Sequence, residues 1–140
     1  MKINEGFQIE TPNVFVPWGL HESHLRSLLD VFGLRSVTHG YYTLSCTSLG
    51  GLTHELGFHF YPRSGGILNE LEFFRRSDED QKASFEEFQK HFEAVFGKPT
   101  TGQSGLEGFP SYVWDLNGAR ILHYVFDRFG PEEHMRIQKA

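Results

Sequence analysis

Alternating apolar and polar residues dominate the stretch from Tyr41 to Arg76. In residues 52–61, leucine, phenylalanine and one histidine occupy the even positions, whereas most of the odd positions are polar. This period of two predicts a β-strand with one apolar face, and residues 67–74 repeat it. Glycines at 50–51 and 65–66 interrupt the pattern, so we expect three antiparallel strands joined by two glycine-bearing turns.

Two other segments show the helical period, and each is followed by a glycine. The first predicts a helix over about residues 20–32, terminated by Gly33. The second begins with a capping box formed by Ser84 and Glu87 and ends before Gly97. The apolar stripes of the two helices consist of Leu25, Leu28, Leu29 and Phe32 in the first and of Phe85, Phe88, Phe92 and Phe96 in the second.

Asn117-Gly118 is the strongest hairpin signal in the chain, because both residues tolerate the backbone angles of a two-residue turn. A last strand is expected over residues 133–139, with Met135 and Ile137 on one side. The pairs expected across the two-residue turn are Trp114 with Ile121 in the core, Tyr112 with His123, and Asp115 with Arg120 as a surface ion pair.

The remaining segments give weaker signals. Phe7 and Ile9 alternate with polar residues, and Pro12 and Pro17 follow, which predicts a short strand or hairpin at the edge of the sheet. Residues 100–108 are rich in glycine, serine and threonine, which predicts a surface loop.

These elements predict an α+β fold: an antiparallel sheet of about six to seven strands with two helices on one face. Both helices close on Val-Phe-Gly, 64 residues apart, and each precedes a run of strands. Residues 20–76 and 84–139 therefore suggest a tandem helix-plus-three-strand duplication within a single domain, 1–140. The alternative is that Phe-Gly is simply a convenient helix stop.

Composition narrows the function classes. The net charge is −5, which argues against nucleic-acid binding, since that rests on clustered lysine and arginine. No apolar run is long enough for a membrane span or a signal peptide, so a cytoplasmic location is expected. The single cysteine, Cys46, cannot form an intramolecular disulfide, and its strand phase predicts a buried structural thiol.

The sheet face opposite the helices is predicted to carry large aromatic side chains among charged ones, a composition typical of protein-binding surfaces. Strand phase also places Leu68 there. Alternatively, a loop, a terminus or a second copy of the chain covers this face. The predicted partner-binding residues are Glu55, His59, Tyr61, Glu70, Glu72, Phe74, Arg120, Tyr124, Phe126 and Arg128.

Four of these residues, Glu55, His59, Glu70 and Glu72, are the one group with candidate chemistry. A four-residue turn after Tyr61 would place Glu55 opposite Glu72 and Gly57 opposite Glu70, so that like charges face each other. A metal ion, an arginine such as Arg76 or a protonated carboxylate would relieve this repulsion. The sequence contains no GxSxG, GxGxxG or P-loop motif, and we assign no cofactor, metal ligand or catalytic residue.

Two runs after Ser84 carry a family resemblance: SFEEFQKHFEAVFGKPT and YVWDLNGARILHYVF. They resemble small bacterial proteins of the toxin-immunity or uncharacterised type, in which a helix ending in Gly-Lys-Pro precedes a strand with tryptophan and a tight hairpin. The tandem unit is also similar in architecture to beta-lactamase inhibitory proteins, which bind a target through an open sheet face. Neither resemblance carries over a functional residue.

The leading hypothesis is a non-enzymatic bacterial protein-binding module, such as an immunity protein, whose open sheet face takes a protein partner. An acidic face would speed association with a basic toxin domain. One alternative is a metal-dependent or acid–base enzyme that uses Glu55, His59, Glu70 and Glu72. A second alternative is a homodimer formed through the same face.

Overall fold

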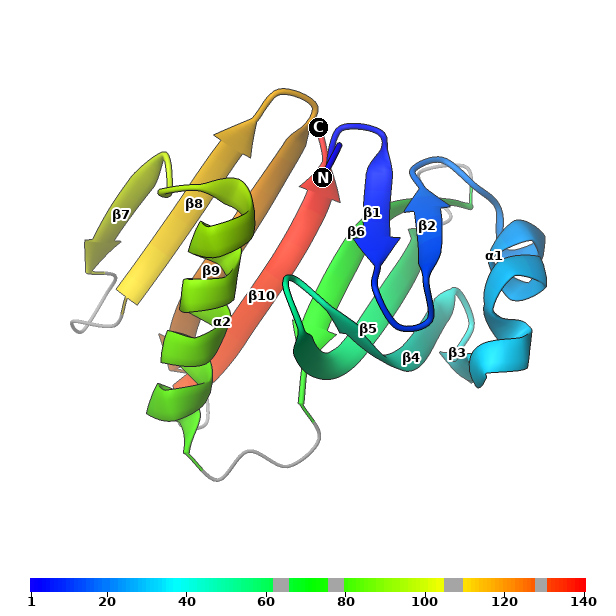
Figure 1. Cartoon of the computed structure of the whole chain (residues 1–140), viewed down its shortest axis with the longest axis horizontal. Coiled ribbons are helices and arrows are strands. Elements are labelled where there is room, and N and C mark those ends of the chain that lie inside the picture. Colours follow the sequence, from blue (N-terminus) through cyan, green and yellow to red (C-terminus); the bar gives the residue numbers. More distant parts are fainter. Residues whose placement is uncertain (62–65, 76–79, 105–109, 128–130) are drawn as a thin grey trace.

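The computed structural model describes residues 1–61, 66–75, 80–104, 110–127 and 131–140. It contains two helices, an eight-stranded antiparallel sheet and a separate two-stranded hairpin (Figure 1). The predicted α+β class is confirmed. Within the described residues, neither helix combines the length and the apolar character needed to cross a membrane.

The sheet has the strand order β3-β4-β5-β6-β10-β9-β8-β7. Each half of the chain contributes a helix followed by four strands, and its last strand lies at the centre, where β6 pairs with β10. The strands are β3 (Arg35–Thr38), β4 (Tyr41–Ser48), β5 (Leu52–Tyr61), β6 (Ile67–Phe74), β7 (Thr101–Ser104), β8 (Pro110–Leu116), β9 (Ala119–Asp127) and β10 (Pro131–Lys139).

Two of these strands, β3 and β7, were not predicted from the sequence. The short edge strands β3 and β7 raise the count from the six or seven expected to eight, and β7 lies within residues expected to form a loop. Four residues are too few to show a clear period of two, so pairing with β4 and β8 decides their conformation. Each half thus reads as a helix plus four strands; a duplication remains a prediction.

The N-terminal hairpin consists of β1 (Gly6–Ile9) and β2 (Val14–Pro17). It does not join the edge of the sheet, as the prolines suggested, but packs over the face of the first half (Figure 1). Phe7 and Ile9 are fully buried, and the Phe7 ring meets Phe73 of β6 edge-on at 5.4 Å. Burial of these side chains outweighs the edge preference of the prolines.

The first helix, α1, spans Glu22–Leu29 and continues as the 3₁₀ turn η1 (Asp30–Phe32), which ends at Gly33 with φ 91°. The second, α2, spans Gln81–Phe96. Its N-cap is Asp80, whose carboxylate accepts a hydrogen bond from the Ala83 amide at 3.0 Å, so the predicted capping box at Ser84 is wrong. Ser84 is buried in the helix and its hydroxyl donates to Glu133 of β10.

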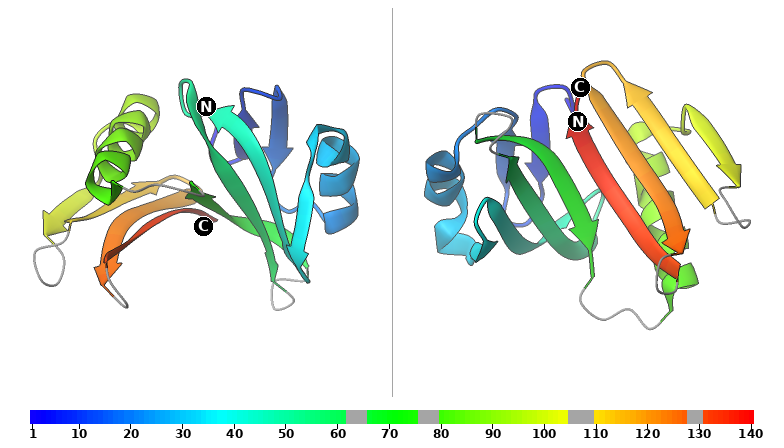
Figure 2. Two further views of the ribbon diagram at one scale, coloured as in Figure 1. Left: turned by 90° about the horizontal axis from the view of Figure 1, so that it is seen from below. Right: turned by 180° about the vertical axis from the view of Figure 1, so that it is seen from behind.

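One hydrophobic core connects the two halves. Phe92 of α2 is fully buried, and its ring lies 5.6 Å from Phe73 of the first half and 5.7 Å from Trp114 of the second. Cys46 lies in the same core, where burial raises the pKa of its thiol to about 12. Helix α2 and the hairpin lie on one side of the sheet, and no described helix or hairpin covers the other side (Figure 2). We call that other side the open face.

Candidate functional site

Strand pairing arranges the open-face side chains in rows that run across the sheet, because directly paired residues point to the same side. The first row runs Tyr41, His59, Glu70, Gln138, Arg120, Asp115 from β4 to β8. The second runs Thr43, Gly57, Glu72, Arg136, Leu122, Val113. A third contains Ser45, Glu55 and Phe74 in the first half and Tyr124 with His134 and Ser111 in the second.

The register of β5 against β6 differs by two residues from the expected one. Glu55 pairs with Phe74, not Glu72, and Gly57 pairs with Glu72, not Glu70. A slip of two leaves every face unchanged, so the glutamates stay on the open face. The register also shifts after His59, and this irregularity places Leu68 in the core, where it is 1% exposed. The expectation that Leu68 faces outward is therefore wrong.

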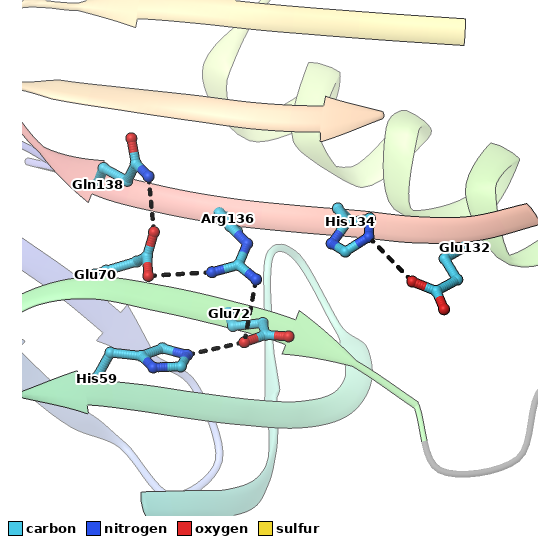
Figure 3. A network of polar contacts seen from close by, with 7 residues as sticks. All are labelled: His59, Glu70, Glu72, Glu132, His134, Arg136 and Gln138. Carbon is cyan, nitrogen blue, oxygen red and sulfur yellow. Dashed lines mark hydrogen bonds and ion pairs between the residues drawn. The ribbon is translucent and has the colours of Figure 1, made fainter. Parts of the chain in front are cut away.

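Arg136 of β10 compensates the charges of Glu70 and Glu72, which lie two residues apart on β6 (Figure 3). Its Nη1 lies 3.1 Å from Glu70 Oε2 and its Nη2 lies 3.8 Å from Glu72 Oε2. Gln138 donates to the other oxygen of Glu70 at 2.7 Å, and His59 Nε2 lies 2.8 Å from Glu72 Oε2. The predicted repulsion between Glu55 and Glu72 does not arise, because Glu55 pairs with Phe74. Arg76, the arginine suggested from the sequence, lies outside the described residues.

Tyr41 completes this network on the β4 side. Its ring stacks on His59 with centroids 4.5 Å apart, and it lies over Gly57, where a Cβ atom would come 2.7 Å from the tyrosine oxygen. Burial, followed by the charge of Glu72, raises the pKa of Tyr41 to about 12. The hydrogen bond with His59 lowers the pKa of Glu72 below its ordinary value. At neutral pH the site thus holds a phenol that can donate and an ionised carboxylate.

The second half presents a matching aromatic pair. Tyr124 of β9 stacks on His134 of β10, with centroids 5.0 Å apart and an interplanar angle of 11°. His134 Nε2 lies 3.5 Å from the exposed Glu132. At the far end of the first row, Arg120 and Asp115 form the predicted ion pair at 2.9 Å, with both side chains more than half exposed.

The predicted partner-binding residues fall into three groups. His59, Glu72, Phe74 and Tyr124 are half-buried and Arg120 is exposed, so all five reach the open surface. Glu55 and Glu70 are each 6% exposed; Glu55 accepts a hydrogen bond from Ser45, and Glu70 is bound to Arg136 and Gln138. The side chains of Tyr61 and Phe126, and Arg128 as a whole, lie outside what the structure describes.

Four further open-face residues were missed from the sequence: Tyr41, His134, Arg136 and Gln138. A signal for three of them existed, since placing Met135 and Ile137 in the core leaves their neighbours on β10 facing outward. Their partners could not be inferred, because nothing local indicates that β10 pairs with β6. Tyr41 was missed because its contact depends on the absence of a side chain at Gly57.

The described residues include no group of three His, Cys, Asp or Glu side chains placed to hold a metal ion. The four-residue constellation predicted from the sequence is also divided, since Glu55 bonds to Ser45 while Glu70 and Glu72 contact Arg136.

Two polar clusters that contain a serine and a histidine lie in the core. Ser48 Oγ is hydrogen-bonded to His54 Nε2, and the two residues are 0% and 3% exposed. Burial lowers the pKa of His54 to about 4. Near α2, the Ser84 hydroxyl donates to one carboxylate oxygen of Glu133, and His123 Nε2 lies 3.4 Å from the other oxygen. Both arrangements are closed to solvent, and their polar atoms satisfy one another, so they stabilise the core.

No family model matches this chain, and no curated protein matches it. A similar solved structure is the 2.13 Å crystal structure of a DUF4309 family protein, YjgB, from Bacillus subtilis subsp. subtilis str. 168. The two chains share 10% sequence identity and a TM-score of 0.47, over 86% of this chain and 78% of that one. The chain thus bears a structural resemblance to an uncharacterised bacterial protein, and this similarity carries no functional argument.

Proposed function

We propose that this chain is a non-enzymatic protein-binding module that receives a basic partner protein on its open face. The supporting observation is the network of Figure 3, in which His59, Glu72 and Arg136 are half-buried, joined by ion pairs and left uncovered by the described elements. Side chains fixed by one another lose little rotamer freedom when a partner binds, which favours affinity.

The composition of the open face fits an interface with a polar rim. Stacked pairs, Tyr41 with His59 and Tyr124 with His134, offer flat aromatic surface, and Leu122 of β9 lies beside Arg136 in the second row. Tyrosine and arginine are enriched where interfaces concentrate binding energy. Glu132 and Asp115 add exposed negative charge to the same face.

The chemistry of the partner follows from charge. The chain carries a net charge of −5, so a basic partner would be steered toward it, with an association rate that falls as salt rises. A bacterial immunity protein against a basic toxin domain is the specific form of this proposal. It is motivated by the resemblance of the helix-and-hairpin run after Ser84.

The test is capture of a partner by variants of the open face. Tyr124→Ala combined with Glu132→Lys removes an aromatic anchor and reverses an exposed charge, whereas Glu70 is unsuitable because its side chain is buried against Arg136. Glu86→Lys on α2 makes the same charge change on the other side of the sheet and serves as the control. The identified partner, once purified, is titrated calorimetrically against each variant.

We expect the open-face variant to lose at least about 2 kcal/mol of binding free energy, and the Glu86→Lys variant to bind as the native chain does. Equal binding by all three proteins would reject the open face as the interface. The two alternative functions predict different results. An acid–base enzyme would lose turnover with His59→Ala, and a homodimer formed through the open face would lose self-association with Tyr124→Ala.

A further inference from the structure

Glu72 on the open face uses one of its two carboxylate oxygens inside the protein. Its Oε2 lies 2.8 Å from His59 Nε2 and 3.8 Å from Arg136 Nη2. Within the described residues, Oε1 has no hydrogen-bond or ion-pair partner, and in Figure 3 it points away from His59. A carboxylate accepts hydrogen bonds on both oxygens, so Oε1 is available to a molecule outside the chain.

Glu70, two residues earlier on β6, shows the contrast. Both of its oxygens are occupied, by Arg136 and by Gln138, and the residue is 6% exposed. The Glu72 side chain is 27% exposed, and the hydrogen bond with His59 lowers its pKa below the ordinary value. Glu72 is therefore an ionised carboxylate that is fixed through one oxygen and reaches the surface with the other.

Aromatic side chains flank Glu72 on the open face. Phe74 follows it by two residues on β6, and His134 precedes Arg136 by two residues on β10, so both point to the same side of the sheet. Phe74 is half-buried, and His134 stacks on Tyr124. The pairing of β6 with β10 ends at Glu72 and Arg136, and the two strands move apart beyond it (Figure 1). Phe74 and His134 therefore border Glu72 without being paired with each other.

The charges around Glu72 favour a cation. In the network of Figure 3, Glu70, Glu72 and Glu132 are the carboxylates, and the guanidinium drawn there is that of Arg136. Arg136 lies closer to Glu70, at 3.1 Å, than to Glu72, at 3.8 Å, so it compensates the charge of Glu72 less. A partly buried carboxylate also attracts a cation more strongly than a fully solvated one, because water and salt screen it less.

We infer that Glu72 Oε1 accepts an arginine side chain of the partner protein, whose guanidinium lies between Phe74 and His134. This inference rests on the proposed function and names the residue type by which the open face recognises its basic partner. Arginine suits the site better than lysine, because its planar group donates N–H while its faces stack on aromatic rings, and because it is less strongly hydrated. Glu72 is thus the anchor of the open face.

Nα-acetyl-arginine amide is the probe for the site itself. It is titrated into the isotope-labelled native chain and followed by NMR, beside the matching lysine and citrulline compounds. Citrulline has the shape of arginine without its charge. We expect the arginine compound to shift the amide signals of Glu72, Phe74 and His134 with a dissociation constant on the order of 10 mM. The lysine compound should bind at least about threefold more weakly, and the citrulline compound should cause no shift.

Two variants and a matched control locate the site. Glu72→Gln should weaken binding of the arginine compound at least about tenfold. Glu132→Gln removes the same charge from an exposed position on the same face and should weaken it less than about threefold. Phe74→Leu keeps an apolar side chain without the ring, so it should abolish the preference for arginine over lysine. Urea denaturation checks the fold of each variant, and if Glu72→Gln does not fold, Phe74→Leu decides.

The outcomes separate this inference from the proposed function. Equal shifts with all three compounds, or shifts that do not centre on Glu72, overturn the inference. A captured partner that is lost with Tyr124→Ala plus Glu132→Lys but binds Glu72→Gln as well as the native chain also overturns it, while the open face stays the interface. Arginine-specific shifts at Glu72 without any captured partner would support the cation site and count against the proposed function.

Discussion

Arg136 and Glu70 lie 3.1 Å apart although 66 residues separate them in the sequence. The arginine belongs to the last strand of the second half and the glutamate to the last strand of the first, so this ion pair crosses the central strand pair β6–β10. It connects the two halves on the open face, as Phe92 connects them in the core.

The first prediction concerns this ion pair. Arg136→Gln removes the cation shared by Glu70 and Glu72 and leaves the mostly buried Glu70 poorly compensated. We expect a loss of about 2 kcal/mol in the free energy of unfolding, below the usual range for a fully buried pair because Arg136 is partly exposed. Urea denaturation measures the loss. Arg120→Gln, at an exposed pair, should cost less than about 1 kcal/mol; equal losses would contradict the assigned role.

The second prediction is a pH dependence that originates in His54. In the folded chain burial lowers its pKa from the ordinary 6.5 to about 4, whereas in the unfolded chain it takes up a proton below about 6.5. The unfolded state therefore binds more protons between these values, and the free energy of unfolding falls as the pH drops through this window. This loss is absent well above pH 6.5 and amounts to roughly 3 kcal/mol by pH 4.

Replacing His54 with glutamine isolates this contribution. Urea denaturation of both proteins between pH 7 and pH 4 should give a shallower loss of stability for His54→Gln, since that side chain does not titrate. His123 is present in both proteins, and burial lowers its pKa as well, so it contributes equally to each curve. Parallel curves would show that His54 does not titrate in this window.

The third prediction concerns the space above Gly57. Gly57→Val introduces a Cβ atom 2.7 Å from the Tyr41 oxygen, so the tyrosine must leave its stack on His59. We expect a loss of about 1–3 kcal/mol in the free energy of unfolding, as for other overpacked sites. In a Tyr41→Ala background the same change should cost much less. An equal cost in both backgrounds would assign the effect to the backbone.

The fourth prediction compares two phenylalanines of α2. Phe92→Ala empties a fully buried site between Phe73 and Trp114 and should lower the free energy of unfolding by about 3–5 kcal/mol. Phe96 is only partly buried, so Phe96→Ala should cost less than about 2 kcal/mol. Chemical denaturation of the two variants checks the order, and the reverse order would mean that Phe92 does not join the two halves of the core.

Local signals predicted part of the fold well. The Asn117-Gly118 turn fixed the register of β8 and β9, so that Trp114 pairs with Ile121 and Tyr112 with His123, as expected. A two-residue turn leaves little choice of register. The turn after β5 lacks such a signal, and the register shift that follows His59 cannot be recognised from a period-two pattern.

The sequence predicted which side of the sheet the site residues occupy, but not which side chains they contact. Period-two alternation placed His59, Glu72 and Tyr124 outward, and each is half-buried on the open face. Their partners are set by strand order, which local patterns do not encode: Arg136 reaches Glu72 only because β10 pairs with β6. The exposed fraction of each side chain could not be predicted either, because Glu55 and Glu70 face outward and are nevertheless covered by neighbouring side chains.

The two short outer strands have a consequence for how the protein behaves at high concentration. Strands β3 and β7 are four residues each, and β3 has a register shift between Ser36 and Thr38. Free backbone groups along a long, flat outer strand are what allow sheets to add to one another and grow into fibrils. In the described part of the chain, the eight-stranded sheet ends on both sides in strands that offer little such template, which makes fibril growth from the folded state unfavourable.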